Sequence, residues 1–304
     1  MNLVGDMNLF DYFKQLWTDK QKDVDIKQGV SSLVPTDGRL SNTDSLEQGG
    51  YRVASCQSSG VERYHNEDTV FTLSTMINDI ALPAAIGIFM IADGMGGHQS
   101  GEVASRLAVE TVSRILIDEL LKAVILDHRP LSENDCSELL KAAFSEAQDC
   151  ILQQVPGGGT TLTLAVGIGN KFFSAHVGDS RLYKIDLEGK IHLQTKDHSL
   201  VKRLVDLGEI SQQEASNHPQ RNVLYKAIGQ SDPFQPDIDQ YHLQAGERLL
   251  ICSDGLWGVL SDGVMEEIIK EIPDLDCLAV DLVNKANAGG GPDNISVILV
   301  ERIA

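Results

Sequence analysis

The stretch IGIFMIADGMGG over residues 86–97 sets an apolar run directly before an aspartate and a group of glycines. The run Ile86–Ile91 predicts a buried strand, and so does the run Arg248–Cys252, which Asp254 follows after one serine. Each aspartate is therefore expected where a strand meets a loop. A fold built on such strands would place its acids at strand ends.

Acidic residues occur in four such segments, which lie far apart along the chain: Arg63–Asp68, Asp93–Gly97, Ser253–Gly255 and Gly291–Asn294. If the strand ends converge, the acids meet and raise each other's pKa values unless a divalent cation neutralises them. Ligand sets made of oxygen alone suit Mg²⁺ or Mn²⁺. The pattern predicts a hydrolytic site that uses divalent metal ions.

The length and composition predict a soluble globular protein, with 304 residues of which 42% are hydrophobic. The formal net charge of -19 disfavours sequence-independent binding to nucleic acid or to anionic lipid, because both require a basic surface. The longest apolar run, over residues 80–92, is too short to cross a bilayer. The first residues lack the basic start of a secretory signal.

The five cysteines indicate a reducing compartment, because their number is odd and their spacing is unpaired. None of them lies six residues before an arginine, so a phosphate-cradling loop with a nucleophilic cysteine is not expected. Together with the lack of a signal, these features predict a cytoplasmic protein.

Three zones differ in character along the chain. Residues 1–27 predict an amphipathic segment, which either docks on its own domain or recruits a membrane or a partner helix. Residues 28–49 have the composition of a linker. A catalytic domain is expected over residues 51–303, with a charged helical insert near residues 200–221 that is a candidate flap.

Within this domain, amphipathic helices are predicted over roughly residues 101–123 and 134–154, as covers for sheets. Residues 160–168, 171–177 and 181–185 are expected to form consecutive strands. Because the turns between them are very short, each strand is expected to be the antiparallel neighbour of the next. A doubly wound sheet is therefore not expected.

Six ordered motifs carry a resemblance to a known family: Arg63–Asp68, Asp-Gly-Met-Gly-Gly from Asp93, Gly-Gly-Thr-Thr from Gly158, His-Val-Gly-Asp-Ser-Arg ending at Arg181, Asp-Gly-Leu-Trp from Asp254, and Asp293-Asn294. In order and spacing they resemble the type 2C metal-dependent protein serine/threonine phosphatases, in their bacterial form. The resemblance covers about residues 51–303. It implies an α+β fold, a four-layer α-β-β-α sandwich of two antiparallel sheets flanked by helices, with the metals at one end.

The resemblance also implies a ligand set for two cations. Asp93 would lie between both ions and the Gly94 carbonyl would bind one of them, while Asp254 and Asp293 would bind the other. Two such ions lower the pKa of a shared water, which attacks phosphorus in line without a phosphoenzyme. Taken singly, each of these acids has the alternative of a turn aspartate or a helix cap.

Three further residues match motifs of the family. Glu67 and Asp68 match acids that hold metal-bound waters. Arg63 matches a phosphate-binding arginine, whose planar fork can grip two phosphate oxygens. The alternative for Arg63 is a surface ion pair with Glu62 or Glu67.

The sequence departs from the family in two places. Where animal members carry a histidine proposed to protonate the leaving group, this chain has Met95, so the general acid is left unassigned. Asp179 matches a ligand of a third, weaker metal site, but Gly258 stands where members often supply another acid. Asp179 therefore either binds that ion or braces Arg181 or its own turn.

The acids together predict an enzyme that hydrolyses phosphoserine and phosphothreonine in proteins with two Mn²⁺ or Mg²⁺ ions. A weaker third ion is expected only if Asp179 is a ligand. Its expected partners are phosphorylated proteins and a serine/threonine kinase or its targets, and a monomer is expected. Two alternatives come from other classes. A catalytically silent binding module would have lost an acid such as Asp254 or Asp293, and an acidic calcium buffer would cluster its ligands in one short loop.

Overall fold

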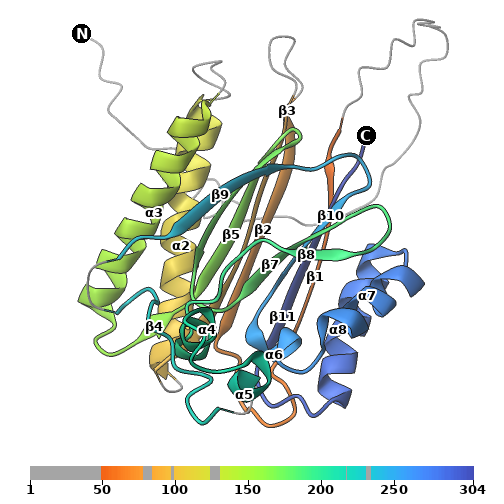
Figure 1. The fold of residues 1–304 in the computed structure, drawn as a ribbon. Helices are drawn as coiled ribbons and strands as arrows, with labels where there is room; N and C mark the ends of the chain where they lie inside the picture. The colour runs from red at the N-terminus through yellow and green to blue at the C-terminus, as the bar shows by residue number, and fades with distance from the viewer. Residues whose placement is uncertain (1–48, 78–83, 97–98, 124–130, 217, 231–233) are drawn as a thin grey trace, which may run out of the picture. The chain divides into compact units, whose positions relative to one another are not determined.

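A computed structural model describes residues 49–77, 84–96, 99–123, 131–216, 218–230 and 234–304 (Figure 1). One compact unit runs from Glu47 to Ala304. The amphipathic segment predicted over residues 1–27 lies outside the described residues, and so does the predicted linker apart from Gly49. Of the helices that the structure describes, none combines the length and the apolar character needed to cross a membrane.

The described strands form two antiparallel sheets. The first has the order β1-β11-β10-β7-β8, with β1 Tyr51–Ser58, β7 Arg181–Ile185, β8 Ile191–Leu193, β10 Arg248–Cys252 and β11 Ile295–Arg302. The second has the order β2-β3-β5-β6-β9, with β2 Asp68–Ile77, β3 Ala84–Met95, β5 Leu162–Ile168, β6 Lys171–Val177 and β9 Asp237–His242. A short strand, β4 Gly159–Thr160, pairs with β3. The two apolar runs that predicted buried strands lie in β3 and β10, which confirms that prediction.

Helices cover the outer face of each sheet (Figure 1). The second sheet packs against α2 Gln99–Leu121 and α3 Glu133–Gln154, and the first against α7 Asp262–Glu271 and α8 Leu275–Ala288. The short helices are α4 Leu200–Asp206 and α5 Gln212–Ser216, both in the insert, and α6 Asp254–Trp257, which follows β10. The result is the α-β-β-α sandwich that the resemblance implied.

Helix α3 shows how the sequence produces this packing. Ser132 caps its N-terminus, because the Ser132 hydroxyl accepts from the Asp135 N–H while the Asp135 carboxylate accepts from the Ser132 N–H. The apolar face expected within residues 134–154 is buried, and Phe144 is fully inaccessible to solvent. Burial of one such side chain contributes about 1.5–3 kcal/mol. The predicted helical periodicity is confirmed.

A separate apolar cluster joins the two sheets. The ring of Tyr51 in β1 meets the rings of Phe89 and Phe172 edge-on, with centroid distances of 5.9 and 5.3 Å. The Tyr51 hydroxyl donates to the Gly169 carbonyl at 2.6 Å, so the buried oxygen is paired. These contacts hold β1 against the second sheet, and strand ends of both sheets can therefore meet in one site.

The strands predicted over residues 160–168, 171–177 and 181–185 were expected to be neighbours in one sheet, and this prediction was wrong for the third strand. Strands β5 and β6 pair antiparallel, but β7 lies in the other sheet, between β10 and β8. The turn after β6 crosses between the sheets at Gly178, which has a φ of 111° and leaves no room for a Cβ beside Thr161. Short turns force antiparallel pairing only when the chain stays in one sheet. The crossing places Asp179 where the two sheets meet.

Candidate metal centre

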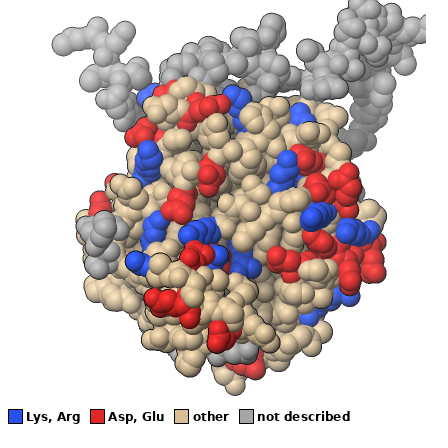
Figure 2. Space-filling view, in the orientation of Figure 1, with Lys and Arg blue, Asp and Glu red and all other residues tan. Residues whose placement is uncertain are grey.

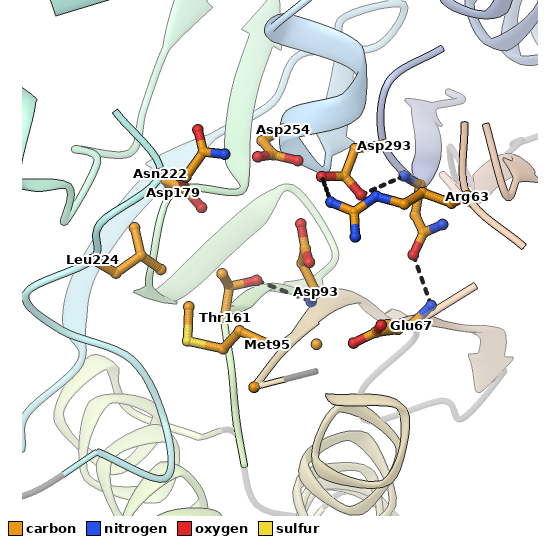
Figure 3. Close-up of a pocket in the computed structure, with 13 residues that line it drawn as sticks. Arg63, Glu67, Asp93, Met95, Thr161, Asp179, Asn222, Leu224, Asp254 and Asp293 are labelled. Carbon is orange, nitrogen blue, oxygen red and sulfur yellow. Dashed lines mark hydrogen bonds and ion pairs between the residues drawn. The ribbon is translucent and has the colours of Figure 1, made fainter. Parts of the chain in front are cut away.

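Strand ends from both sheets surround one pocket (Figure 3). Its lining residues are Arg63, Glu67, Asp93, Gly94, Met95, Gly96, Thr161, Asp179, Asn222, Leu224, Asp254, Asp293 and Asn294. The structure thus brings together every residue predicted for the site except Asp68. That residue is buried and pairs with Asp93 across β2 and β3.

The backbone of Asp93 is fixed by two threonines. Its N–H donates to the Thr161 hydroxyl at 3.0 Å, and its carbonyl accepts from the Thr160 hydroxyl at 2.8 Å and from the Thr161 N–H at 2.9 Å. The carboxylate takes no part in these bonds and projects into the pocket (Figure 3). The main chain therefore presents the Asp93 carboxylate in one orientation.

Asp68 is held by two serines that sequence reasoning missed. Its Oδ2 accepts from the hydroxyls of Ser253 and Ser296 at 2.9 and 2.6 Å. Its Oδ1 is buried and has no hydrogen-bond partner among the described residues, and the same holds for Oδ1 of Asp254. Buried oxygens without partners are costly. Each of these two oxygens could be satisfied by a cation or by a water molecule that is bound to a cation.

The crowding of carboxylates raises their pKa values. Burial, followed by the charges of Asp68 and Asp254, raises the pKa of Asp93 well above its ordinary value. Burial, followed by the charge of Asp179, does the same for the pKa of Asp254. Burial also raises the pKa of Asp68 to about 6 and the pKa of Asp179 to about 7. These acids would hold protons near neutral pH unless a cation replaced them.

The donor set fits an ion that keeps part of its water. In the described parts of the chain, no three Asp, Glu, His or Cys side chains stand close enough together to hold an ion by themselves. Mg²⁺ is usually bound through one or two carboxylates together with waters. Single carboxylates around an open pocket, with the Gly94 carbonyl beside them, match that requirement. The candidate ligands come from segments far apart in the chain, namely β3, the start of α6 and the residues before β11, which is unlike a calcium buffer.

Arg63 forms its ion pair with Asp293. The Nη2 atom of Arg63 lies 2.8 Å from Oδ2 of Asp293, and its Nε donates to the Pro292 carbonyl at 3.4 Å. Figure 3 shows the guanidinium at the edge of the pocket, opposite the side formed by Met95 and Leu224. The predicted phosphate-binding group therefore borders the carboxylates.

Asn294 fixes the loop that carries Arg63 and Glu67, a role that sequence reasoning missed. Its side-chain oxygen accepts from the Glu67 N–H at 2.8 Å, and its amide nitrogen donates to the carbonyls of Ser59 and His65 at 2.9 and 2.8 Å. Asn294 is 5% exposed. Its place beside Asp293 in a motif was the available signal, since an amide can both donate and accept.

Arg181 is braced by Asp197. Its guanidinium donates to both carboxylate oxygens of Asp197, at 3.0 and 2.7 Å, and lies 3.7 Å from the centre of the Trp257 ring. The Trp257 indole N–H donates to the Asp179 carbonyl at 3.0 Å. The Asp179 carboxylate lies at the pocket near Asn222 (Figure 3). This position favours the alternative in which Asp179 is a metal ligand.

The segment that follows the insert reaches the pocket through Asn222 and Leu224. Its base is tied to the second sheet by His198, which is buried. The His198 Nδ1 atom accepts from the Gly178 N–H at 3.0 Å, so its Nε2 carries the hydrogen toward Asp237 Oδ2, 3.1 Å away. Met95 lines the same side of the pocket, and the described lining residues include no histidine.

Comparisons with known proteins agree with this geometry. The family model for protein phosphatase 2C matches residues 58–276. The chain is 36% identical over 246 residues to the serine/threonine phosphatase stp of Listeria monocytogenes, and the matched region covers 79% of this chain and 91% of the relative. The solved S. agalactiae serine/threonine phosphatase matches with a TM-score of 0.70 and 29% identity, over 84% of this chain and 100% of that one. The catalytic domain of PstP, solved with two manganese ions, matches with a TM-score of 0.67 and 30% identity over the same shares.

Proposed function

Because this chain belongs to the protein phosphatase 2C family and is a protein serine/threonine phosphatase, we propose that it uses a pair of divalent cations to activate the attacking water. The water displaces serine or threonine from phosphorus in line, and no phosphoenzyme forms. The cations are Mn²⁺ or Mg²⁺. The two manganese ions in the PstP structure support the pair.

The observation that carries this proposal is the pair of buried carboxylate oxygens without partners, Oδ1 of Asp68 and Oδ1 of Asp254. Both belong to acids whose pKa values are raised, so the metal-free site is electrostatically frustrated. A cation relieves the repulsion and supplies the missing partners at once. A site built only for structure would instead pair these oxygens with protein donors.

The proposed pair of ions would be held by Asp93, the Gly94 carbonyl, Asp254 and Asp293, all of which line the pocket. When bound, such ions lower the pKa of a water and offset the charge of phosphoryl oxygens.

The other acids would hold waters of the ions or a third ion. Glu67 and Asp68 would accept hydrogen bonds from waters of the ions, and Asp179 with Asp254 would form a weaker third site. The Ser253 and Ser296 hydroxyls orient the Asp68 carboxylate by binding one of its oxygens.

Arg63 positions the substrate. Its planar guanidinium can donate two parallel hydrogen bonds to phosphate oxygens, which fixes the phosphorus relative to the attacking water. In the structure this fork rests on Asp293, whose side chain is 31% exposed. An arriving phosphate would compete with that carboxylate for the guanidinium, while a cation would compete with the guanidinium for the carboxylate. Binding of the phosphate to Arg63 and of the cation to Asp293 would therefore both break this ion pair.

The substrates are phosphorylated proteins, with a serine/threonine kinase or its targets as partners, and the protein acts as a monomer in the cytoplasm. The face in Figure 2 supports the exclusion of nucleic acid, since acidic side chains gather over α7 and α8. Those two helices carry six acids and two lysines: Asp262, Glu266, Glu267, Glu271, Asp276, Asp281, Lys270 and Lys285. Such a surface repels a phosphate backbone.

The test is release of phosphate from a phosphothreonine peptide with Mn²⁺ and with EDTA. Turnover is expected with Mn²⁺, none with EDTA, and none from Asp254→Ala in either condition. The matched control is Asp239→Ala, which removes an exposed aspartate of β9 and should retain full turnover. A protein that binds Mn²⁺ without turnover would instead be a silent binding module.

A further inference from the structure

Two glycines allow the first turn of α2 to touch the predicted metal site. Gly94 follows Asp93 in β3, and Gly101 lies in the first turn of α2 and is buried. A Cβ on Gly94 would collide with the Gly101 carbonyl and lie 2.7 Å from the Glu67 carbonyl oxygen. The helix therefore packs directly on the backbone of the predicted ligand.

Gly101 is required for space and not for backbone conformation. It lies inside a helix and outside the left-handed region, a conformation that any residue adopts. Alanine is the better helix former, so helix propensity alone would favour Gly101→Ala. A Cβ at this position, however, would run into Oε2 of Glu67 and lie 3.0 and 3.1 Å from the carbonyl carbon and oxygen of Gly94. The Glu67 carboxylate occupies the space that a side chain at residue 101 would fill.

The backbone of Glu67 cannot move to make room. Its N–H donates to Asn294 at 2.8 Å. Its carbonyl accepts from the Ser105 hydroxyl at 2.6 Å and from the Gly94 N–H at 3.2 Å. Ser105 belongs to the same helix as Gly101, so the helix fixes the Glu67 main chain and clears a place for its carboxylate. An added Cβ at Gly101 must therefore be accommodated mainly by the Glu67 carboxylate, which it would meet most closely, with a smaller adjustment at the Gly94 carbonyl.

We propose that Gly101 is a positioning residue. Because it has no side chain, the first turn of α2 leaves room for the Glu67 carboxylate to point toward the cations. The inference rests on the proposed function, in which Glu67 accepts from waters of the ions. The severe clash falls on the far end of a flexible side chain, and the contacts with the Gly94 backbone, at 3.0 and 3.1 Å, are only slightly tight. Gly101→Ala is therefore expected to displace the Glu67 carboxylate and to leave the fold intact.

The experiment compares Gly101→Ala with Gly263→Ala. Gly263 lies in the first turn of α7, where nothing comes within 4 Å of an added Cβ. Mn²⁺ affinity is measured by titration calorimetry, and thermal unfolding is followed in EDTA. Gly101→Ala is expected to weaken Mn²⁺ binding about 10-fold, the lower end of what loss of an outer-shell partner costs. Its Tm in EDTA should not fall below that of the unaltered protein. Gly263→Ala should leave Mn²⁺ affinity unchanged, and any change in its Tm should be a small rise, because alanine is the better helix former.

A second pair of variants shows whether Gly101 acts through Glu67. In a Glu67→Ala background, adding Gly101→Ala is expected to change Mn²⁺ affinity by less than about 2-fold, because the clashing carboxylate is gone. An equal loss in both backgrounds, or no loss from Gly101→Ala alone, would overturn the proposal. If Gly101→Ala does not fold, Glu67→Asp with Gly101→Ala is expected to fold, since the shorter acid retreats from the helix, and its failure would also overturn the inference.

The same titration separates this inference from the function on which it rests. An unaltered protein that binds no Mn²⁺ overturns both. An unaltered protein and a Gly101→Ala variant with equal affinities overturn the role of Gly101 alone.

Discussion

Nη2 of Arg63 and Oδ2 of Asp293 lie 2.8 Å apart, so the group predicted to grip phosphate and a carboxylate predicted to bind a cation hold each other. Both side chains are partly exposed, at 51% and 31%, and pairs of this kind contribute little to stability. The pair is therefore easily exchanged for a metal ion and a phosphate. It keeps both groups in place at little cost when neither ligand is bound.

This relationship predicts opposite effects of Arg63→Ala on substrate and metal. KM for a phosphothreonine peptide should rise about 10-fold or more, since the bidentate contact to phosphate is lost. Mn²⁺ affinity should stay equal or improve, because a competing positive charge leaves Asp293. Steady-state kinetics and titration calorimetry measure the two effects, with Arg52→Ala on β1 as the exposed control. Weaker Mn²⁺ binding by Arg63→Ala would contradict this account of the pair.

The buried carboxylates predict that a disabling substitution stabilises the metal-free protein. Asp254→Asn replaces a carboxyl group whose charged form is opposed by burial and by neighbouring acids, so the free energy of unfolding in EDTA at pH 7 should rise. Urea unfolding measures the gain. The control Asp239→Asn should leave stability unchanged, and a loss of stability in Asp254→Asn would show that the carboxylate is favourably held.

The raised pKa values also fix the pH dependence of stability without metal. The pKa of Asp68 is about 6 and that of Asp179 about 7 in the folded protein, above the ordinary value of 3.8. Between about pH 4 and 7 the folded state therefore holds more protons than the unfolded chain, and these groups make stability fall as pH rises. The destabilisation is absent below the unfolded pKa and complete above the folded one.

Unfolding in urea at pH 5, 6 and 7 tests this dependence, with EDTA in one series and excess Mn²⁺ in the other. In EDTA, Asp68→Asn should show a flatter decline than the unaltered protein. With Mn²⁺ the trend should reverse, because metal binding releases protons and strengthens as pH rises. Identical slopes for Asp68→Asn and the unaltered protein would show that Asp68 does not titrate in this range.

Asn294→Ala should loosen the Arg63 loop. Three hydrogen bonds to main-chain atoms would be lost from a buried side chain, at a cost of about 1–3 kcal/mol in the free energy of unfolding. KM should rise as well, since Arg63 is no longer held. Thermal unfolding and peptide kinetics measure both, and Asn170→Ala in an exposed turn is the control. A change in stability with KM unaltered would limit Asn294 to a structural role.

Local pattern was enough to predict α3 and the buried runs in β3 and β10, because helical periodicity and unbroken apolar stretches depend on neighbours in the chain. The sheet to which β7 belongs could not be predicted from local pattern. Its preceding turn is as short as that of a hairpin, and only packing against Thr161 shows that Gly178 sends the chain to the other sheet.

The residues of the site also fall into a group that the sequence predicted and a group whose roles only the structure revealed. The acids were found from motifs, whereas the hydrogen-bonding roles of Ser253, Ser296 and Asn294 became clear only in the structure. The hydrogen bonds from Ser253 and Ser296 to Asp68 span 185 and 228 positions, and the bond from Glu67 to Asn294 spans 227. Nothing in one segment of sequence shows which hydroxyl or amide will arrive from so far away.

The pairing of β1 with β11 has a consequence for the time at which activity arises. In the described sheet β1 has β11 as its neighbour, and Asp293 lies two residues before β11 begins at Ile295. A chain emerging from the ribosome, at about 5–20 residues per second, carries Arg63 and Asp93 long before Asp293 exists. If Asp293 binds a cation as proposed, the nascent protein cannot dephosphorylate its surroundings before β11 is made. Phosphate release would therefore report only on chains that extend at least to this strand.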